Sequence, residues 1–172
     1  MLCDLIKRKL AICAFGALAS LCISTPALAL DAGAQAPDFE LPSAQESVKL
    51  SKIQGKVIYL DFWASWCGPC GESFPWMNAM QEKYKQKGLQ VIAINLDAKN
   101  DDAQKFLAQH SAKFTVLFDS KGVTPRQYGV KGMPTSFLIN QDGKVLAQHK
   151  GFNHADRAEL EQKILAALEG QK

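Results

Sequence analysis

Uninterrupted apolar runs along the chain predict β-strands that are buried on both faces of a sheet. Residues 57–62 (VIYLDF) are nearly all apolar and rich in β-favouring side chains, which is typical of a central strand. Similar runs occupy residues 91–96, 114–118, 135–139 and 145–148. The last two flank Asn140-Gln141-Asp142-Gly143, whose Asp-Gly pair predicts a short β-hairpin. Two short extended segments, residues 39–41 and 48–50, precede these strands.

Helical spacing of apolar residues fills the gaps between the strands. The first helix should be kinked by Pro75 and end at Gly88. Its apolar face consists of Phe74, Met77, Met80 and Tyr84. The second helix is predicted to be capped within Asn100-Asp101-Asp102 and to turn Phe106 and Leu107 inward.

Two further helices are predicted towards the C-terminus. Thr124 is expected as the N-cap of the third, with Pro125 at its first position. Asn153 and Asp156 form a capping-box-like start to the fourth. Its apolar face comprises Leu160, Ile164, Leu165 and Leu168, with Gly170 beyond its end. The order β-α-β-α-β-α-β-β-α predicts an α/β fold with a central mixed β-sheet flanked by helices on both faces.

The first 29 residues have the pattern of a secretory signal peptide. The basic cluster Lys7-Arg8-Lys9 precedes an uncharged stretch from Leu10 to Ile23, and Ala27-Leu28-Ala29 supplies a small-x-small cleavage site. We therefore predict a signal peptide over residues 1–29, cleaved after Ala29, and one exported, periplasmic domain over residues 30–172. An uncleaved N-terminal membrane anchor is the alternative, although a spanning helix usually needs about 20 apolar residues.

Composition excludes two classes of protein. The 172 residues are 47% hydrophobic, which excludes a disordered chain, and the net charge of +3 is too small to indicate a nucleic-acid-binding surface. Five cysteines are an odd number for a closed disulfide framework. Removal of residues 1–29 would leave Cys67 and Cys70 as a single pair, in a domain large enough to fold without disulfide bonds.

This pair forms the motif Cys67-Gly68-Pro69-Cys70 where the first strand hands over to the first helix. A C-x-x-C motif beside a βαβ pattern is typical of thioredoxin-like redox sites. Cys67 should lie at the helix N-terminus, where free N–H groups and the macrodipole favour a thiolate and lower its pKa below about 8.5. Cys70, one turn later, should face inward, stay protonated and resolve a mixed disulfide. Gly68-Pro69 should permit the tight turn and preset an early helical φ.

Two other uses of the cysteines are open at this point. A purely structural disulfide would close a two-residue loop and so contribute little loop entropy. Zinc binding by the cysteines with His149 and His154 would need ligand pairs much farther apart than the roughly 12–15 residues of zinc fingers. These histidines are more typical of solvated positions, and His110, near a helix end, of a partner for the C-terminal dipole. We expect no metal site.

The run from Asp61 to Cys70 (DFWASWCGPC) resembles the active-site segment of thioredoxins. The rest of the chain resembles one exported branch of that superfamily, the TlpA/ResA-like thiol–disulfide oxidoreductases. The matching segments are residues 33–41 (GAQAPDFEL), 74–77 (FPWM), 91–95 (VIAIN), 128–135 (YGVKGMPT), 137–139 (FLI) and 142–143 (DG). The resemblance implies a thioredoxin-like fold with an N-terminal β-hairpin and a central αβ insertion, here residues 98–128.

The resemblance also implies roles for residues around the cysteine pair. Met133-Pro134 would be a cis-proline loop opposite the cysteines, with an ordinary trans turn as the alternative. Asp61, a carboxyl group in an apolar strand, should have a raised pKa and would act as general acid or base for Cys70. An Asp that simply reaches water at a strand end is the alternative. The residues expected to contact an extended substrate are Trp66, Gly68, Pro69 and Met133.

One departure from the family concerns a second carboxyl group. ResA-like proteins often carry a Glu three residues after the second cysteine, whereas this chain has Ser73 there and its acid at Glu72. Neighbouring helical residues point about 100° apart, so Glu72 cannot be assumed to substitute. Proton handling is therefore expected to resemble that of thioredoxin more than that of ResA.

These features together predict an exported thiol–disulfide oxidoreductase that reduces periplasmic client proteins through the Cys67/Cys70 dithiol, for example in cytochrome c or metal-site maturation. The redox-active Cys67–Cys70 disulfide is expected to need no other cofactor. Expected partners are disulfide-containing clients and a membrane thiol–disulfide electron donor, with no nucleic acid, and the protein is expected to be a monomer. Two alternatives stay open: a disulfide oxidase or isomerase using the same site, and a non-catalytic thiol module that binds metal or a partner.

Overall fold

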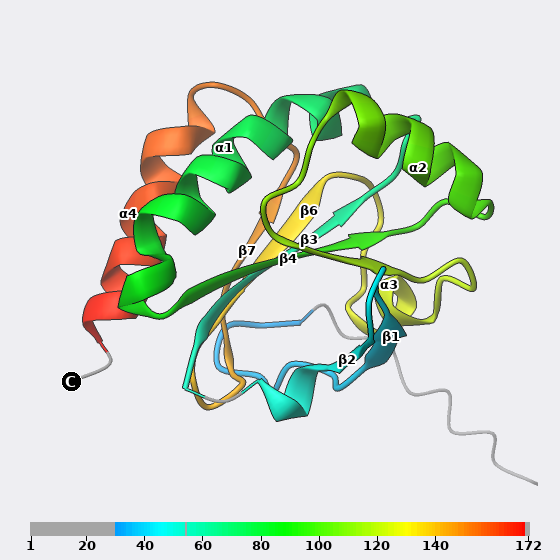
Figure 1. Cartoon of the computed structure of the whole chain (residues 1–172). Helices are drawn as coiled ribbons and strands as arrows, with labels where there is room; N and C mark the ends of the chain where they lie inside the picture. The colour runs from blue at the N-terminus through cyan, green and yellow to red at the C-terminus, as the bar shows by residue number, and fades with distance from the viewer. Residues whose placement is uncertain (1–29, 54, 171–172) are drawn as a thin grey trace, which may run out of the picture.

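A five-stranded mixed sheet forms the centre of the domain in the computed structural model, which describes residues 30–53 and 55–170 (Figure 1). Its strands are β3 (Val57–Trp63), β4 (Leu89–Asn95), β5 (Thr115–Phe118), β6 (Thr135–Ile139) and β7 (Val145–Lys150). The order across the sheet is β5-β4-β3-β6-β7. Strand β3 pairs in parallel with β4, and β4 with β5, whereas β6 pairs antiparallel with both β3 and β7. The predicted mixed sheet is confirmed.

Helices cover both faces of this sheet, as predicted. Three of them, α1 (Gly68–Tyr84), α2 (Asn100–Gln109) and α4 (Asp156–Glu169), pack against one face (Figure 1). The short α3 (Val123–Gln127) lies on the opposite face together with the N-terminal segment. Two short 3-10 turns, Leu50–Lys52 and Lys85–Lys87, complete the elements, and Gly88 (φ 99°) follows the second of these.

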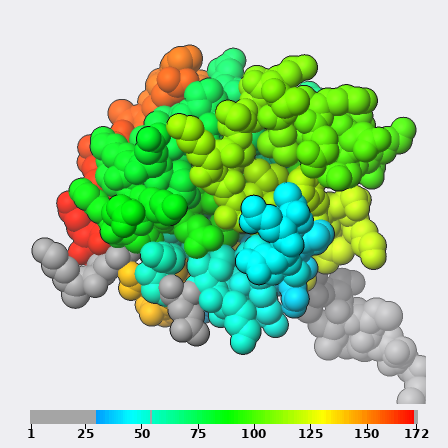
Figure 2. Space-filling model, in the orientation of Figure 1, coloured from blue at the N-terminus to red at the C-terminus, as the bar shows by residue number. Residues whose placement is uncertain are grey.

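The two additions to the basic fold are also present. Strands β1 (Glu40–Pro42) and β2 (Ser47–Lys49) form the predicted antiparallel N-terminal hairpin. The predicted insertion, residues 98–128, contains α2, β5 and α3. The hairpin lies against β5, and both the hairpin and α2 are at the surface on the side seen in the space-filling view (Figure 2).

Strand β3 is buried along its whole length, and its side chains alternate between two apolar clusters. Tyr59 and Trp63 join the cluster beneath α1 and α4, which also contains both cysteines of the motif. Leu60 and Phe62 join the cluster on the other face. Because side chains alternate along a strand, Asp61 points to the same side as Tyr59 and Trp63, towards α1.

Two predicted helix starts are wrong. Helix α2 has Lys99 at its N-cap and no side-chain cap. Asp101 and Asp102 lie in the first turn instead, where their negative charges interact favourably with the helix dipole. Helix α3 begins at Val123, one residue before the predicted cap Thr124. Its cap comes from outside the helix, because Asp119 Oδ2 accepts the Thr124 N–H at 2.7 Å.

The predicted capping box at the start of α4 is confirmed. Asp156 Oδ2 accepts the N–H of Asn153 at 2.9 Å, and Asn153 Oδ1 accepts the N–H of Asp156 at 3.3 Å. Asn153 Oδ1 also accepts the N–H of Ala155 at 2.8 Å. The two side chains therefore satisfy backbone donors reciprocally.

The predicted signal peptide, residues 1–29, lies outside the described residues, so its cleavage stays a prediction. Among residues 30–53 and 55–170, no helix combines the length and apolar character needed to cross a membrane.

Candidate active site

Cys67 and Cys70 lie at the N-terminus of α1 and are joined by a disulfide bond. The S–S distance is 2.07 Å and the Cα–Cα distance is 5.3 Å. Cys67 is the N-cap of α1 and has an extended backbone, while Pro69 lies in the first turn. Since β3 ends at Trp63 and α1 begins at Gly68, only residues 64–67 separate the sheet from this helix. The predicted placement of the pair, at the start of the helix that follows the central strand, is confirmed.

The two cysteines differ in their access to solvent. Cys67 is 6% exposed, whereas Cys70 is 0% exposed. The free N–H groups at the start of α1 favour negative charge on Cys67, because this is the positive end of the helix dipole. Cys67 is therefore the more accessible sulfur of the pair, and Cys70 lies behind it.

A carboxylate from the neighbouring strand end holds the loop that precedes Cys67. Ser65 donates its backbone N–H to Asp97 Oδ2 at 2.9 Å and its hydroxyl to Asp97 Oδ1 at 3.0 Å. The side-chain amide of Asn95 donates to Oδ2 at 2.7 Å. A role for Asp97 was not predicted from the sequence, although functional sites in α/β proteins often lie at the carboxyl ends of parallel strands. Asn95 and Asp97 stand at such a position, directly after an apolar run.

Asp61 is a buried carboxyl group on the α1 side of the sheet. It is 2% exposed, and its Oδ2 has no hydrogen-bond partner among the described residues. Burial away from water disfavours the charged form and raises the pKa of Asp61 well above the usual range of a carboxyl group. The alternative of an Asp that reaches water at a strand end is therefore wrong. Since α1 covers this side of β3, Asp61 faces the helix that carries Cys70.

Two predicted substrate-contacting residues come together next to Cys67. Trp66 is 72% exposed, and it lines a shallow pocket of about 360 Å³ together with Gly132 and Met133. Met133 also packs against the apolar cluster that contains both cysteines. The Met133–Pro134 peptide bond is cis. Gly68 and Pro69 are exposed in the first turn of α1, on the surface between Cys67 and Cys70.

The histidines of the zinc alternative have other surroundings. His149 Nε2 lies 3.2 Å from Asp156 Oδ2, and His154 is exposed. Within the part of the chain that the structure describes, no group of three or more His, Cys, Asp or Glu side chains is arranged to hold a metal ion.

Comparison with known proteins identifies the family. Residues 31–164 match the Redoxin family. The chain is 38% identical to the thiol-disulfide oxidoreductase ResA of Bacillus thuringiensis over 123 residues, 71% of each chain. It is 31% identical to ResA of Bacillus subtilis over 136 residues, 78% of this chain and 76% of the relative. The chain belongs to the TlpA/ResA-like branch of the thioredoxin superfamily. It is therefore a thiol–disulfide oxidoreductase.

Solved structures agree with this assignment. A crystal structure from Chlorobium tepidum, assigned as the thiol:disulfide interchange protein DsbE, is 69% identical with a TM-score of 0.80. It covers 81% of this chain and 99% of that one. A solution structure from Neisseria meningitidis, assigned as a thioredoxin, is 28% identical with a TM-score of 0.69, and covers 78% of this chain and 89% of that one.

This ResA-like protein has Ser73 where the resemblance suggested a Glu. The Ser73 side chain is buried, and its hydroxyl donates to the carbonyl oxygen of Cys70 at 2.9 Å. Glu72, the preceding residue, is exposed to solvent. Glu72 therefore does not take the place of a buried carboxyl group, and Asp61 is the acid that faces α1.

Two glycines of this ResA-like site differ in the space around them. Gly68 is helical, and a Cβ added there would meet no atom within 4 Å. The prediction that the turn needs a glycine at position 68 is therefore wrong. At Gly71 a Cβ would lie 3.1 Å from His110 Cε1. His110 is the C-cap of α2, near the helix end as expected, and its ring packs against that of Phe106 with centroids 4.4 Å apart. A side chain immediately after Cys70 would therefore need the His110 ring to shift by a few tenths of an ångström.

The raised pKa of Asp61 predicts that the stability of this ResA-like protein depends on pH. A carboxyl group whose folded pKa is raised binds its proton more tightly in the folded state, so stability falls as pH rises above the unfolded pKa of about 3.9. The loss is complete above the folded pKa and amounts to about 1.4 kcal/mol for each unit of difference. Asp61→Asn is therefore expected to stabilise the protein increasingly from pH 4 to pH 8, as measured by urea unfolding of the oxidised form.

The matched control is Asp38→Asn, which should change stability in the opposite direction. Burial acts to raise the pKa of Asp38, but hydrogen bonds from the Ser51 backbone and hydroxyl and the charge of Lys49 outweigh it, so the pKa is lowered. Its contribution is present above the unfolded pKa and lost at lower pH, so Asp38→Asn should destabilise at pH 8. A stability difference for Asp61→Asn that is constant across pH would contradict a raised pKa of Asp61 in the folded protein.

Proposed function

We propose that the protein is an exported reductase of disulfide bonds in periplasmic client proteins. The observation that carries the proposal is the asymmetry of the cysteine pair, with Cys67 at the edge of the surface and Cys70 fully buried on the Asp61 side of α1. Gly68-Pro69 supports the reducing direction, because thioredoxin-type sites lie at the reducing end of the potential series, near about −270 mV. The signal-like pattern of residues 1–29 supports export.

The proposed cycle begins with attack of the Cys67 thiolate on a client disulfide. One client sulfur leaves as a thiolate and takes a proton from water, while the other forms a mixed disulfide with Cys67. Cys70 then gives its proton to Asp61 and attacks Cys67, which releases the second client sulfur. The client gains two electrons, and the protein is left with the Cys67–Cys70 disulfide. The raised pKa of Asp61 brings its proton affinity closer to that of a thiol, which suits proton exchange with Cys70.

The cycle requires a source of two electrons, which we assign to a membrane thiol–disulfide transporter. Such a donor would reduce the Cys67–Cys70 disulfide by the same exchange in reverse. The clients proposed are proteins with cysteines that must be reduced before a haem or a metal is inserted, as in cytochrome c maturation. The protein is proposed to act as a monomer through the pocket lined by Trp66 and Met133.

The redox potential tests the direction of exchange. Equilibration with glutathione buffers, followed by quantification of the Cys67–Cys70 disulfide, is expected to give a value near about −270 mV. A Cys70→Ser protein, which cannot form the internal disulfide, is the control for glutathione adducts. A potential near about −120 mV would identify an oxidase and contradict the proposed reductase.

A further inference from the structure

Asp61 is one end of a line of polar side chains that crosses three strands. Asp61 on β3 lies directly opposite Ser136 on β6, and Ser136 lies directly opposite His149 on β7. Both strand pairs are antiparallel, so the Cβ atoms of directly opposed residues are about 4.5–5.5 Å apart and share one face of the sheet. We call these three residues the polar row. Asp61 and Ser136 are buried, whereas the side chain of His149 is 21% exposed.

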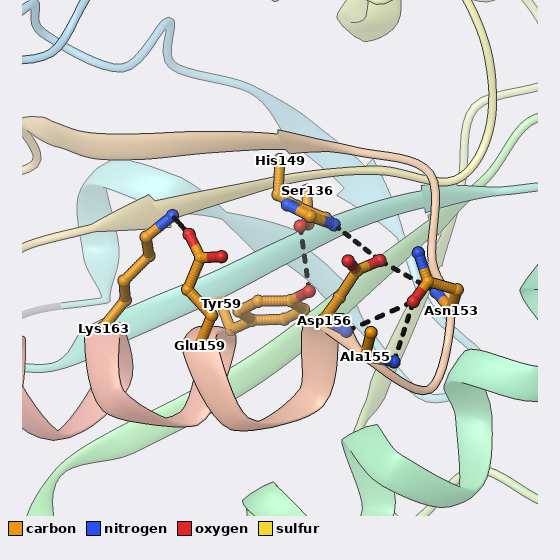
Figure 3. A network of polar contacts seen from close by, with 8 residues as sticks. All are labelled: Tyr59, Ser136, His149, Asn153, Ala155, Asp156, Glu159 and Lys163. Atoms are coloured by element: carbon orange, nitrogen blue, oxygen red, sulfur yellow. Dashed lines mark hydrogen bonds and ion pairs between the residues drawn. The ribbon is translucent and has the colours of Figure 1, made fainter.

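Contacts around the polar row extend it to the surface at α4 (Figure 3). The hydroxyl groups of Tyr59 and Ser136 are hydrogen-bonded at 2.8 Å. His149 Nε2 lies 3.2 Å from Asp156 Oδ2, and the Asp156 side chain is 20% exposed. The row therefore runs from a carboxyl group that has no polar partner on one oxygen to the contact between His149 and Asp156, where both side chains are partly exposed to solvent.

A small cavity lies beside the outer part of the row, at Ser136 and His149; Asp61 does not line it. This cavity of about 10 Å³ is lined by Tyr59, Ser136 and His149 together with side chains of β6, β7 and α4. This is close to the volume of about 10–15 Å³ that a single water needs. Burial, followed by the negative charges of Asp61 and Asp156, raises the pKa of Tyr59, so both carboxyl groups act on the same hydroxyl.

We propose that the polar row carries the proton that Asp61 exchanges with solvent in each redox cycle. This inference rests on the proposed proton transfer between Cys70 and Asp61. After that transfer, Asp61 holds a proton that it must release. The Ser136 hydroxyl accepts this proton from Asp61 as it passes its own proton, directly or through one water, to His149, and His149 releases a proton to solvent beside Asp156. Only O–H and N–H bonds change, and no electrons move.

Charged groups of α4 lie around the outer end of the row. Asp156, Glu159 and Lys163 of α4 surround His149, and Lys163 is paired with Glu159 at 2.6 Å (Figure 3). Tyr59 and Asp61 of β3 face Ser136 from the other side. Asp156 also caps α4, so a purely structural role for His149 in supporting that cap is the competing explanation.

The test compares Ser136→Ala and His149→Gln with Gln148→Ala, which changes β7 on the opposite face. Stopped-flow fluorescence would follow reduction and reoxidation of Cys67 and Cys70 between pH 5 and pH 9. Each row variant is expected to slow the step about tenfold near pH 7, which is less than the roughly 100-fold or more that a general acid or base itself contributes, because Asp61 is still present. Ser136→Thr, which keeps the hydroxyl, should retain the rate, and added imidazole should restore the rate of His149→Gln. Gln148→Ala should match the unaltered protein.

Folding and the role of Asp61 are checked separately. Urea unfolding shows whether each variant is folded; if Ser136→Ala is not, His149→Gln with imidazole decides alone. Folded row variants with unaltered rates at every pH, or slowing that imidazole does not relieve, would overturn the polar row while leaving Asp61 in place, provided that Asp61→Asn is slow. If Asp61→Asn itself reacts at the unaltered rate, both the proposed proton transfer and the row are overturned.

Discussion

A Cys70→Ser protein is expected to lose turnover completely and to accumulate covalent complexes with its clients. Cys67 keeps its position at the start of α1 and can still attack a disulfide, but the buried sulfur that would release the client is gone. The mixed disulfide then has no internal resolving thiol and persists. The measurement is non-reducing electrophoresis of an extract from cells that export the variant, followed by mass spectrometry of bands that disappear on reduction.

Cys67→Ser is the matched control, because it removes the other sulfur from the same disulfide. Cys70 is 0% exposed, so a lone Cys70 should capture few clients. Equal capture by the two variants would contradict the assignment of Cys67 as the attacking thiol. Absence of any adduct with Cys70→Ser would favour a non-catalytic thiol module.

Asp61→Asn is expected to slow resolution of the mixed disulfide by roughly 100-fold at pH 7, as removal of a general base does. Asn has a similar volume but cannot take the proton of Cys70. The defect should shrink at high pH, because the thiol then ionises without help from a base. Rapid-quench analysis of a mixed disulfide preformed on Cys67 would isolate this step from client binding.

Asp119→Asn is the control for loss of a buried carboxyl group elsewhere in the fold. Asp119 is 4% exposed and caps α3 by accepting the Thr124 N–H, a bond that the amide oxygen of Asn can also accept. Its resolution rate should match that of the unaltered protein at every pH. A slow Asp61→Asn protein whose defect is the same at pH 7 and pH 9 would indicate distorted geometry rather than a lost base.

Features that depend on local pattern could be predicted from the sequence. The apolar run of β3, the cysteine motif at the start of α1 and the α4 capping box all follow from spacing within a few residues. The cap of α3 could not, because Asp119 precedes the helix and replaces the nearer candidate Thr124. Asp119 and Thr124 both suit the start of a helix, and which of them caps α3 depends on where the chain turns before it.

Side-chain contacts between strands could not be predicted from the sequence, for a different reason. The pairing of Asp61 with Ser136 and of Ser136 with His149 depends on the register of three strands, and a shift of one residue would move every side chain to the other face. The hydrogen bonds from Ser65 to Asp97 likewise form only because β4 lies parallel to β3. From the sequence alone, these residues are isolated polar positions.

The open space at Gly68 makes the protein adaptable as a laboratory reagent. A Cβ added there would meet no other atom within 4 Å, whereas one at Gly71 would lie in tight contact with the His110 ring. Charged residues placed at position 68 would act on the adjacent Cys67 through the electrostatics of the helix end. A small library at that single codon could therefore yield reductants of graded strength on an unaltered scaffold.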